Sequence, residues 1–502
     1  MNADGASPQE RQLVTAVQDA LLPAGVVALP AVDIAARYLL GETGRSAGGD
    51  WFDAVPLPGD RVALVVGDVV GQGVAAASTM GQLRAVVLSA LLTHEHPTPT
   101  LGAAAAFAEV VPEARGATVA IAVLDPGSSS LCYSTAGHPP PLIVRADGTG
   151  SFLPATGGGP LGTGARAPVA AAPFGPGDLV LLYTDGLVVR PGADPADGRA
   201  ELRTVATQAC REASDPQGTA CAAELVCERA LDRIALRTGV WDDAAVLAAQ
   251  RCAPTGDLVL DLPALPDTVR VVRLELGVWL ARLRLSAIDQ LALQQAVGEL
   301  VSNAVEHAYP AGVQALRTSV RLRATHAADG CVEIDVVDDG RWVSSPGPHR
   351  GLALAAGFVD HLETVPRGRG THLRLRHRAL RTARLLSWER DRPLGVGRAP
   401  AETLTVRPGP GRLEVAGAVD ALGVDRLAAE VRRATAGPVA PVVVDLSGVS
   451  LLCSGAVQVL SDALPGAGPV RAPIVLRAPA DSVAGLVLDL ARVPYEGVGP
   501  AA

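Results

Sequence analysis

Four aspartates in the first half of this chain adjoin apolar, strand-like runs. They are Asp50, Asp68, Asp185 and Asp242. Carboxylates that several strands deliver to one edge of a sheet commonly hold hard divalent ions, which prefer oxygen ligands. A pair of such ions can activate a water at neutral pH for attack on phosphorus. The pattern therefore predicts a two-metal site suited to phosphate ester hydrolysis.

A surface turn is the competing interpretation of each aspartate taken singly, because Asp-Gly is also a common turn dipeptide. Four strand-end aspartates in this order are much harder to explain as turns. Two further aspartates, Asp53 and Asp243, are second choices, more typical of turns or of groups that support the ligands.

The elements that must position these carboxylates occupy residues 1–252. Short apolar runs alternate there with turn clusters such as Asp125-Pro126-Gly127, and one helical stretch covers residues 75–92. Many of the runs are apolar on both faces, as strands covered on both sides require. We therefore expect two sheets packed face to face between helices, an α-β-β-α sandwich within a multidomain α/β chain.

The pattern changes over residues 258–378. Two helical patterns, at 269–283 and 288–309, precede alternating strands in which Val332, Ile334 and Val336 face the same way. Helices segregated from an antiparallel sheet predict an α+β layer pair.

The second of these helical patterns carries Glu299 and Asn303, which lie four residues apart and so share one face. An asparagine can supply an oxygen to Mg²⁺, and a nearby glutamate can act as base on an attacking hydroxyl. The alternative is a solvated helix face without chemistry.

The last part of the chain begins with a segment rich in arginine and proline. We expect residues 379–401 to form a linker, helical in part at 379–386. From 402 to 496, strands alternate with helices, as in a small single-sheet α/β domain. Within it, an apolar run at 442–452 leads to Cys453-Ser454-Gly455 at the start of a helical pattern.

Composition limits what the whole chain can be. Its 502 residues are too many for one ordinary domain. A formal charge of −9 argues against nucleic acid as a direct partner. Seven cysteines without a Cys-x-x-Cys motif indicate reduced thiols. With no signal pattern and no uncharged apolar run long enough to cross a membrane, a cytoplasmic protein without a membrane partner is expected.

Four motifs relate the first segment to a known family: Gly49-Asp50-Trp51-Phe52-Asp53, Gly67-Asp68-Val69-Val70-Gly71, Ala136-Gly137-His138-Pro139 and Tyr183-Thr184-Asp185-Gly186. The segment resembles the bacterial metal-dependent serine/threonine phosphatases of the sporulation stage II protein E type. The resemblance implies that Asp68 bridges two Mn²⁺ or Mg²⁺ ions with help from the Val69 carbonyl oxygen. The ligands that complete the second site would be Asp50, Asp185 and Asp242.

The second segment resembles the Bergerat-type ATPase fold, in the branch of small anti-sigma serine kinases. The residues that carry the resemblance are Glu299 with Asn303, Asp338-Asp339-Gly340, Arg350-Gly351-Leu352 and Gly368-Arg369-Gly370-Thr371. It implies Mg-ATP binding, with Asn303 on Mg²⁺ and Glu299 as general base. Asp338 would bind the adenine amino group, and the nucleotide would be lined by Gly340, Gly351 and Thr371.

The third segment resembles the sulfate-transporter and anti-sigma-factor-antagonist (STAS) domain through residues 442–452. That family usually has Asp-Ser-Ser-Gly or Asp-Ser-Thr-Gly at a helix N-terminus, where the hydroxyl is phosphorylated. Here Cys453 replaces the aspartate and the glycine falls one place early, so Ser454 is the remaining candidate phosphosite. The alternative is that Ser454 is the N-cap of the helix, and we favour a docking role without modification.

Together the three modules match a partner-switching circuit of phosphatase, kinase or anti-sigma factor, and antagonist. The resemblance implies a phosphatase that acts on a phosphorylated STAS-type antagonist, with ATP and a sigma factor as further partners. The sequence leaves open whether the chain forms a homodimer. One alternative is a non-catalytic scaffold that binds a sigma factor or antagonist. The other is a regulator dominated by the serine kinase.

Overall fold

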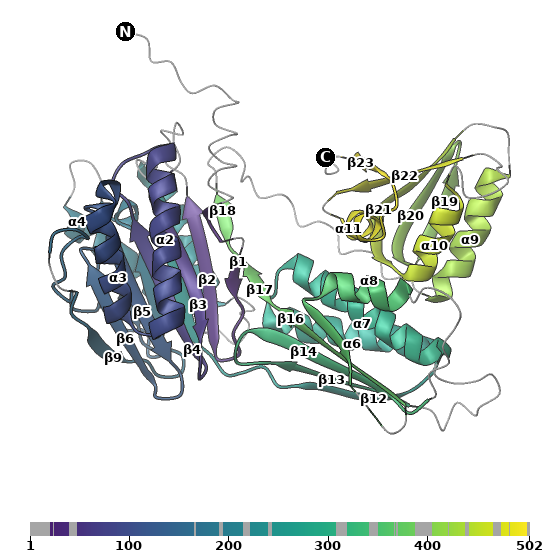
Figure 1. The fold of residues 1–502 in the computed structure, drawn as a ribbon, viewed down its shortest axis with the longest axis horizontal. Coiled ribbons are helices and arrows are strands. Elements are labelled where there is room, and N and C mark those ends of the chain that lie inside the picture. Colours follow the sequence, from purple (N-terminus) through teal and green to yellow (C-terminus); the bar gives the residue numbers. More distant parts are fainter. Residues whose placement is uncertain are drawn as a thin grey trace, which may run out of the picture.

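The structure is a computed structural model of the 502-residue chain. It describes residues 21–23, 25–39, 48–164, 167–189, 194–213, 221–238, 243–307, 319–340, 350–365, 367, 370–386, 404–419, 421–436, 441–464, 473–480 and 482–498. The described elements form three domains in chain order (Figure 1).

The N-terminal domain contains two sheets packed face to face. One sheet is ordered β3 (Trp51–Leu57), β4 (Arg61–Asp68), β5 (Thr118–Asp125), β6 (Ser130–Ala136) and β9 (Ala170–Pro173). The other is ordered β18 (Arg384–Leu386), β2 (Val32–Leu39), β11 (Ala244–Arg251), β10 (Leu179–Tyr183), β7 (Leu142–Val144) and β8 (Gly150–Phe152). Side chains of both sheets share one core, which explains why strands such as β4 and β10 are apolar on both faces.

Four helices cover the outer faces of this sandwich. They are α2 (Val74–His94) and α3 (Pro97–Val110) on the first sheet (Figure 1). On the second sheet they are α4 (Pro195–Ala213) and α5 (Ala222–Thr238). In length and composition α2 could cross a membrane, but Leu83, Val87 and Leu91 belong to the core of the domain. The predicted α-β-β-α sandwich is confirmed.

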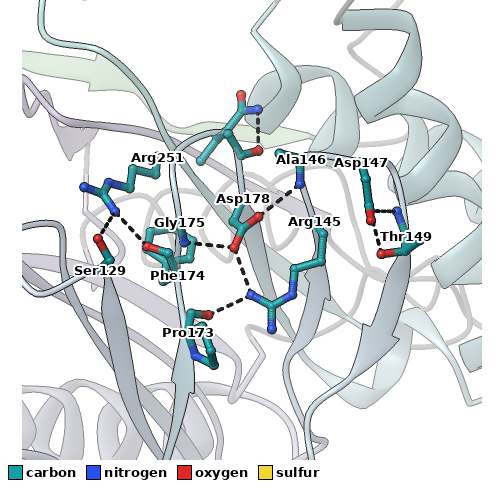
Figure 2. A network of polar contacts seen from close by, with 12 residues as sticks. Ser129, Arg145, Ala146, Asp147, Thr149, Pro173, Phe174, Gly175, Asp178 and Arg251 are labelled. Atoms are coloured by element: carbon teal, nitrogen blue, oxygen red, sulfur yellow. Dashed lines mark hydrogen bonds and ion pairs between the residues drawn. The ribbon is translucent and has the colours of Figure 1, made fainter.

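A polar network fixes the start of β10 (Figure 2). The carboxylate of Asp178 accepts hydrogen bonds from Arg145 Nη1 at 2.8 Å, from the Ala146 amide at 3.0 Å and from the Gly175 amide at 2.9 Å. Arg251 Nη1 donates to the Phe174 carbonyl at 3.0 Å in the same network. The network ties the loops at one end of the sandwich, while the other end of β10 leads to Asp185.

The middle domain packs helices on one face of an antiparallel sheet. The sheet is ordered β12 (Leu258–Pro263), β13 (Ser319–His326), β14 (Cys331–Asp338), β16 (Thr371–Arg378) and β15 (His361–Thr364). The helices are α6 (Pro266–Leu283), α7 (Ala287–His307) and α8 (Arg350–Phe358) (Figure 1). Val332, Ile334 and Val336 are buried against them, as the alternation predicted.

The C-terminal domain is a small α/β unit around one sheet. Its strands are ordered β19 (Thr405–Gly409), β20 (Arg412–Val419), β21 (Val442–Leu452), β22 (Ile474–Pro479) and β23 (Glu496–Val498). All the pairings are parallel except that of β19 with β20. The helices are α9 (Ala421–Thr435), α10 (Ser454–Asp462) and α11 (Val483–Leu490).

The expected helix at residues 379–386 is wrong. These residues form β17 (Leu380–Thr382) and β18 instead, and both strands pair with the N-terminal domain. β17 pairs with β1 (Gly25–Val27). The strands form because unpaired edges of β1 and β2 lie within reach, which a local pattern does not encode.

Candidate functional site

The fold brings the strand-end aspartates to one end of the sandwich. In the antiparallel pair of β3 and β4, Trp51 lies opposite Gly67, so Asp50 and Asp68 are the next residues in register. Asp185 follows β10, and Asp243 precedes β11, which runs antiparallel beside β10. Asp68, Asp243 and Asp185 all lie close enough to Asp50 to raise its pKa electrostatically. The ligand predicted at Asp242 lies outside the described residues.

Asp50 is the most informative member of this acidic cluster. It is 5% exposed, and its Oδ2 oxygen is buried without a hydrogen-bond partner among the described residues. Burial, and then repulsion from Asp68, raise the pKa of its carboxyl group well above the ordinary value. A bound cation would strongly stabilise the ionised form of a carboxylate that is buried among other carboxylates.

The donor set fits a hard divalent ion. The donors predicted from the sequence are carboxylate oxygens and the backbone carbonyl oxygen of Val69, the kind of ligand that such ions prefer. Within the described parts of the chain, no three Asp, Glu, His or Cys side chains already stand at the spacing of a metal cage. The fit therefore rests on donor chemistry and on the orphaned oxygen of Asp50.

The backbone beneath the cluster requires glycine at position 49. The Val69 amide donates to the Gly49 carbonyl at 3.1 Å, and a Cβ added to Gly49 would lie 2.0 Å from the Val69 carbonyl oxygen. The Gly49-Asp50 and Asp68-Val69 segments are thereby held in direct contact.

Three polar side chains around the cluster were not singled out from the sequence, although the quoted motifs contain two of them, His138 and Thr184. The Thr184 hydroxyl is hydrogen-bonded to Asp50, and its oxygen accepts from the Ala245 amide at 2.9 Å. The Tyr38 hydroxyl is hydrogen-bonded to Asp243. These contacts hold two of the carboxylates in place.

His138 connects the two sheets below the cluster. Its Nε2 lies 3.0 Å from the carbonyl oxygen of Tyr183, so Nε2 carries the proton and donates. Its Nδ1 then accepts from the Thr118 hydroxyl at 2.8 Å. Burial lowers the pKa of His138 to about 4, which keeps the imidazole neutral. Thr118 lies opposite Asp68 in the pairing of β4 with β5, so His138 links the strand ends that carry Asp68 and Asp185.

The two second-choice aspartates have different surroundings. Asp53 forms a two-pronged ion pair with Arg84 of α2, at 2.7 Å from Nε and 2.8 Å from Nη2. Its carboxylate is therefore engaged in joining α2 to β3. Asp243 lies in the acidic cluster with Asp50.

The middle domain groups the residues predicted to bind nucleotide in two places. On α7, Glu299 and Asn303 lie beside the start of α8, where a Cβ added to Gly351 would lie 2.8 Å from Glu299 Oε2 and 3.3 Å from Asn303 Nδ2. The Nδ2 atom of Asn303 is buried without a hydrogen-bond partner in the described structure. An orphaned amide at this point fits a site completed by a ligand.

The second group lies at the end of β14. Asp338 Oδ1 accepts from the Gly340 amide at 2.8 Å, and Thr371 lies opposite Asp338 and hydrogen-bonds to it. Burial raises the pKa of Asp338 above the ordinary value. Gly370 is required here, because its φ is +77° and an added Cβ would lie 1.9 Å from the Asp338 carbonyl oxygen.

Ser454 contacts the proposed general base directly. Its hydroxyl donates to Glu299 Oε2 at 2.8 Å, and its amide donates to Glu299 Oε1 at 2.8 Å. The interpretation of Ser454 as the helix N-cap is wrong, because Cys453 is the N-cap of α10 and Ser454 is the first helical residue. The free amide groups at a helix N-terminus favour an anionic partner, and Glu299 supplies it from another domain.

Further contacts seat the C-terminal domain on the middle domain (Figure 1). Arg273 Nη2 of α6 donates to the carbonyl oxygen of Ser450 at 3.3 Å and lies 3.2 Å from its hydroxyl. Leu354 and Phe358 of α8 pack against the core of the C-terminal domain. The approach of Ser454 to Glu299 is thus part of an interface.

Comparison with known proteins agrees with this architecture. Family models match in order: Stage II sporulation protein E (SpoIIE) over residues 58–252, histidine kinase-like ATPase domain over 262–377, and Mlab STAS domain over 403–493. The crystal structure of the RsbU and RsbW domains of Rv1364c from Mycobacterium tuberculosis is 37% identical, covers 73% of this chain and 98% of its own, and has a TM-score of 0.66. Protein IcfG of Synechocystis is 27% identical over 222 residues, which are 37% of this chain and 33% of IcfG, so the match spans about a third of that relative.

The chain therefore combines a SpoIIE phosphatase domain, a histidine kinase-like ATPase domain and a STAS domain. The chain belongs to the family represented by the RsbU and RsbW domains of Rv1364c. The fold class predicted from the sequence is confirmed in all three parts.

Proposed function

We propose that the chain is a metal-dependent protein serine/threonine phosphatase whose substrate is a phosphorylated STAS-type antagonist. The observation that supports this best is the acidic cluster around the buried, orphaned oxygen of Asp50. Asp68, with help from the Val69 carbonyl oxygen, would be a ligand of both Mn²⁺ or Mg²⁺ ions. Asp50, Asp185 and Asp242 would complete the site of the second ion. The ions, when bound, supply Lewis acidity and an activated water.

The chain's own residues orient this site. Hydrogen bonds from Thr184 and Tyr38 hold Asp50 and Asp243 in place. The neutral His138 joins the two sheets through Thr118 and the Tyr183 carbonyl. Positioning of this kind is what places a nucleophile in line with a phosphate ester.

Asp68→Asn tests the proposal. The variant keeps the shape of the side chain and loses the charge that holds two cations, so Mn²⁺-dependent hydrolysis of p-nitrophenyl phosphate should fall by at least ~100-fold, about 2.7 kcal/mol in transition-state stabilisation. Asp125→Asn is the matched control, because Asp125 ends β5 at the opposite end of the same sheet. Near-normal turnover of Asp68→Asn would refute the metal assignment. Wild-type protein without turnover would favour the scaffold alternative.

We further propose that the middle domain binds Mg-ATP. Asn303 would hold Mg²⁺, Asp338 the adenine amino group, and Gly340, Gly351 and Thr371 would line the nucleotide. Asn303 would reach Mg²⁺ through its Oδ1 oxygen, and its unpartnered Nδ2 supports a ligand that offers a hydrogen-bond acceptor beside α7. The buried carboxyl group of Asp338 supports a further polar contact with that ligand. A sigma factor is the further partner implied for this domain.

A second candidate function follows from Ser454 and Glu299: a serine kinase whose acceptor is the chain's own STAS domain. Glu299 would take the hydroxyl proton as Ser454 Oγ bonds to the γ-phosphorus and the bond from that phosphorus to ADP breaks. The 2.8 Å hydrogen bond between base and hydroxyl supports this candidate over docking alone. It also reverses the preference that the missing aspartate had suggested.

Labelling with Mg²⁺ and radioactive ATP distinguishes transfer from docking. In the Asp68→Asn chain, whose phosphatase would be inactive, the kinase candidate predicts label at Ser454 that is lost in Ser454→Ala and Glu299→Gln. Ser447→Ala is the control, since Ser447 lies exposed on β21. A labelled fraction that does not change on dilution would show transfer within one chain. An unlabelled STAS domain would establish docking without modification.

A further inference from the structure

The chain that leaves the ATPase domain continues into the phosphatase domain. Residues 379–386, named the strap here, begin where the Ala379 carbonyl accepts from the Ala28 amide at 3.0 Å. β17 then pairs antiparallel with β1, and β18 pairs parallel with β2. β18 is thereby the edge strand of the second phosphatase sheet (Figure 1). The phosphatase fold is completed by residues that follow the ATPase domain.

A charged anchor holds the strap against β2. Arg381 is 8% exposed, its Nη2 lies 2.5 Å from Asp33 Oδ1, and its Nε donates to the Leu283 carbonyl at 3.3 Å. Arg284, directly after α6, lies 3.6 Å from the other oxygen of Asp33. Removal of Arg381 would leave the Asp33 carboxylate with only the longer contact to Arg284. The anchor therefore joins β2, the end of α6 and the strap.

β2, the strand that pairs with β18 of the strap, leads toward the acidic cluster. In the pairing of β18 with β2, Leu385 lies opposite Tyr38, whose hydroxyl is hydrogen-bonded to Asp243. A Cβ added to Gly48 would lie 2.6 Å from the Tyr38 hydroxyl oxygen and 1.6 Å from Asp243 Oδ2. The segment just before Asp50 therefore packs on these two side chains. A shift of β2 would move Tyr38 and, through it, the carboxylates of Asp243 and Asp50.

We propose that the strap is a positioning element of the phosphatase site, which sets the affinity of the acidic cluster for Mn²⁺ by holding β2 and Tyr38. The inference rests on the proposed phosphatase function for the identity of the ion. It makes metal binding in the first domain depend on a segment that follows the second domain. Any event that displaces the ATPase domain would reach the metal ligands along this path.

Two full-length variants test the strap in different ways. Arg381→Met removes the charge of the anchor, and Leu385→Pro removes an amide donor from β18 while the ion pair remains. Arg323→Met is the matched control, because Arg323 forms an exposed ion pair with Asp257 inside the ATPase domain, 2.8 Å long. The measurements are calorimetric Mn²⁺ titration without nucleotide, and hydrogen exchange of β2 in EDTA.

Both strap variants should bind Mn²⁺ at least ~10-fold more weakly, as expected when a supporting group of a metal site is lost. Residues 36–39 should also exchange faster, and hydrolysis of p-nitrophenyl phosphate should recover at saturating Mn²⁺. If Arg381→Met does not fold, Leu385→Pro decides the question. Wild-type turnover together with unchanged Mn²⁺ affinity and exchange in the strap variants would overturn this inference alone. Wild-type protein that neither binds Mn²⁺ nor hydrolyses the ester would overturn the proposed function and this inference with it.

Discussion

Protonation of His138 should destabilise the phosphatase domain in mild acid. The pKa of this buried imidazole is lowered to about 4, from 6.5 for the free side chain. Between these two values the unfolded state binds a proton that the folded state does not, so stability falls as the pH falls from 6.5 to 4. The full loss is about 3 kcal/mol, and the part lost between pH 7.5 and 5.5 is about 1.4 kcal/mol.

His138→Asn removes the titrating group. The prediction therefore concerns how much the stability of the wild-type chain and of this variant each changes between the two pH values. In EDTA, the increase in opening of β5 and β10 from pH 7.5 to pH 5.5 should be about tenfold larger in the wild-type chain than in the variant, because the 1.4 kcal/mol contributed by His138 is a factor of about ten. Hydrogen exchange of these strands, corrected for the intrinsic rate at each pH, measures the change. The variant should be less stable at pH 7.5 and lack most of the additional opening at pH 5.5.

His94→Asn is the control for this experiment, because His94 lies exposed in the last turn of α2 in the same domain. It should keep the pH dependence of the wild-type chain. Equal pH dependence in wild type and His138→Asn would refute the assignment of a neutral, desolvated imidazole that donates to the Tyr183 carbonyl.

Two other substitutions test the remaining polar groups. Asn303→Ala should weaken Mg-ATP binding and leave Mn²⁺-dependent hydrolysis of p-nitrophenyl phosphate unchanged, since the sites lie in separate domains. The loss of protection by ATP against thermal unfolding measures the weaker binding. A wild-type chain that ATP does not protect would contradict the nucleotide site. Asp178→Ala should destabilise the phosphatase domain by about 2–4 kcal/mol, because Arg145 and two backbone amides lose their common acceptor (Figure 2). Exchange in β7 and β10 should accelerate while β14 is unchanged, and no change in either strand would contradict the role of this network.

Regular elements were predictable wherever one physical pattern dominated. The alternation at Val332, Ile334 and Val336 predicted β14, since a sheet with one covered face buries every second side chain. The doubly apolar runs before Asp68 and Asp185 predicted strands between two layers for the same reason. Glu299 and Asn303 lie on one face of α7, as their spacing required.

Short segments were not predictable in this way. The strap has few residues, and over so short a length a helical and an extended pattern are equally compatible with its side chains. Its state is decided by the unpaired edges of β1 and β2, with which it forms backbone hydrogen bonds. Ser454 is a comparable case: a hydroxyl before a helix predicts a cap, but the position of Glu299 made another partner available.

The sequence by itself indicated three domains and their fold class, and it predicted the chemistry of the strand-end aspartates and of the Glu299–Asn303 pair, which stays a prediction. Such features depend on residue type and on spacing within one element, where burial period and ligand chemistry act locally. Only the tertiary structure decided that Ser454 donates to Glu299, 155 residues away, and that the strap completes the phosphatase sheet beside Tyr38. These contacts depend on which surfaces the packed domains present to each other, and no local pattern contains that information.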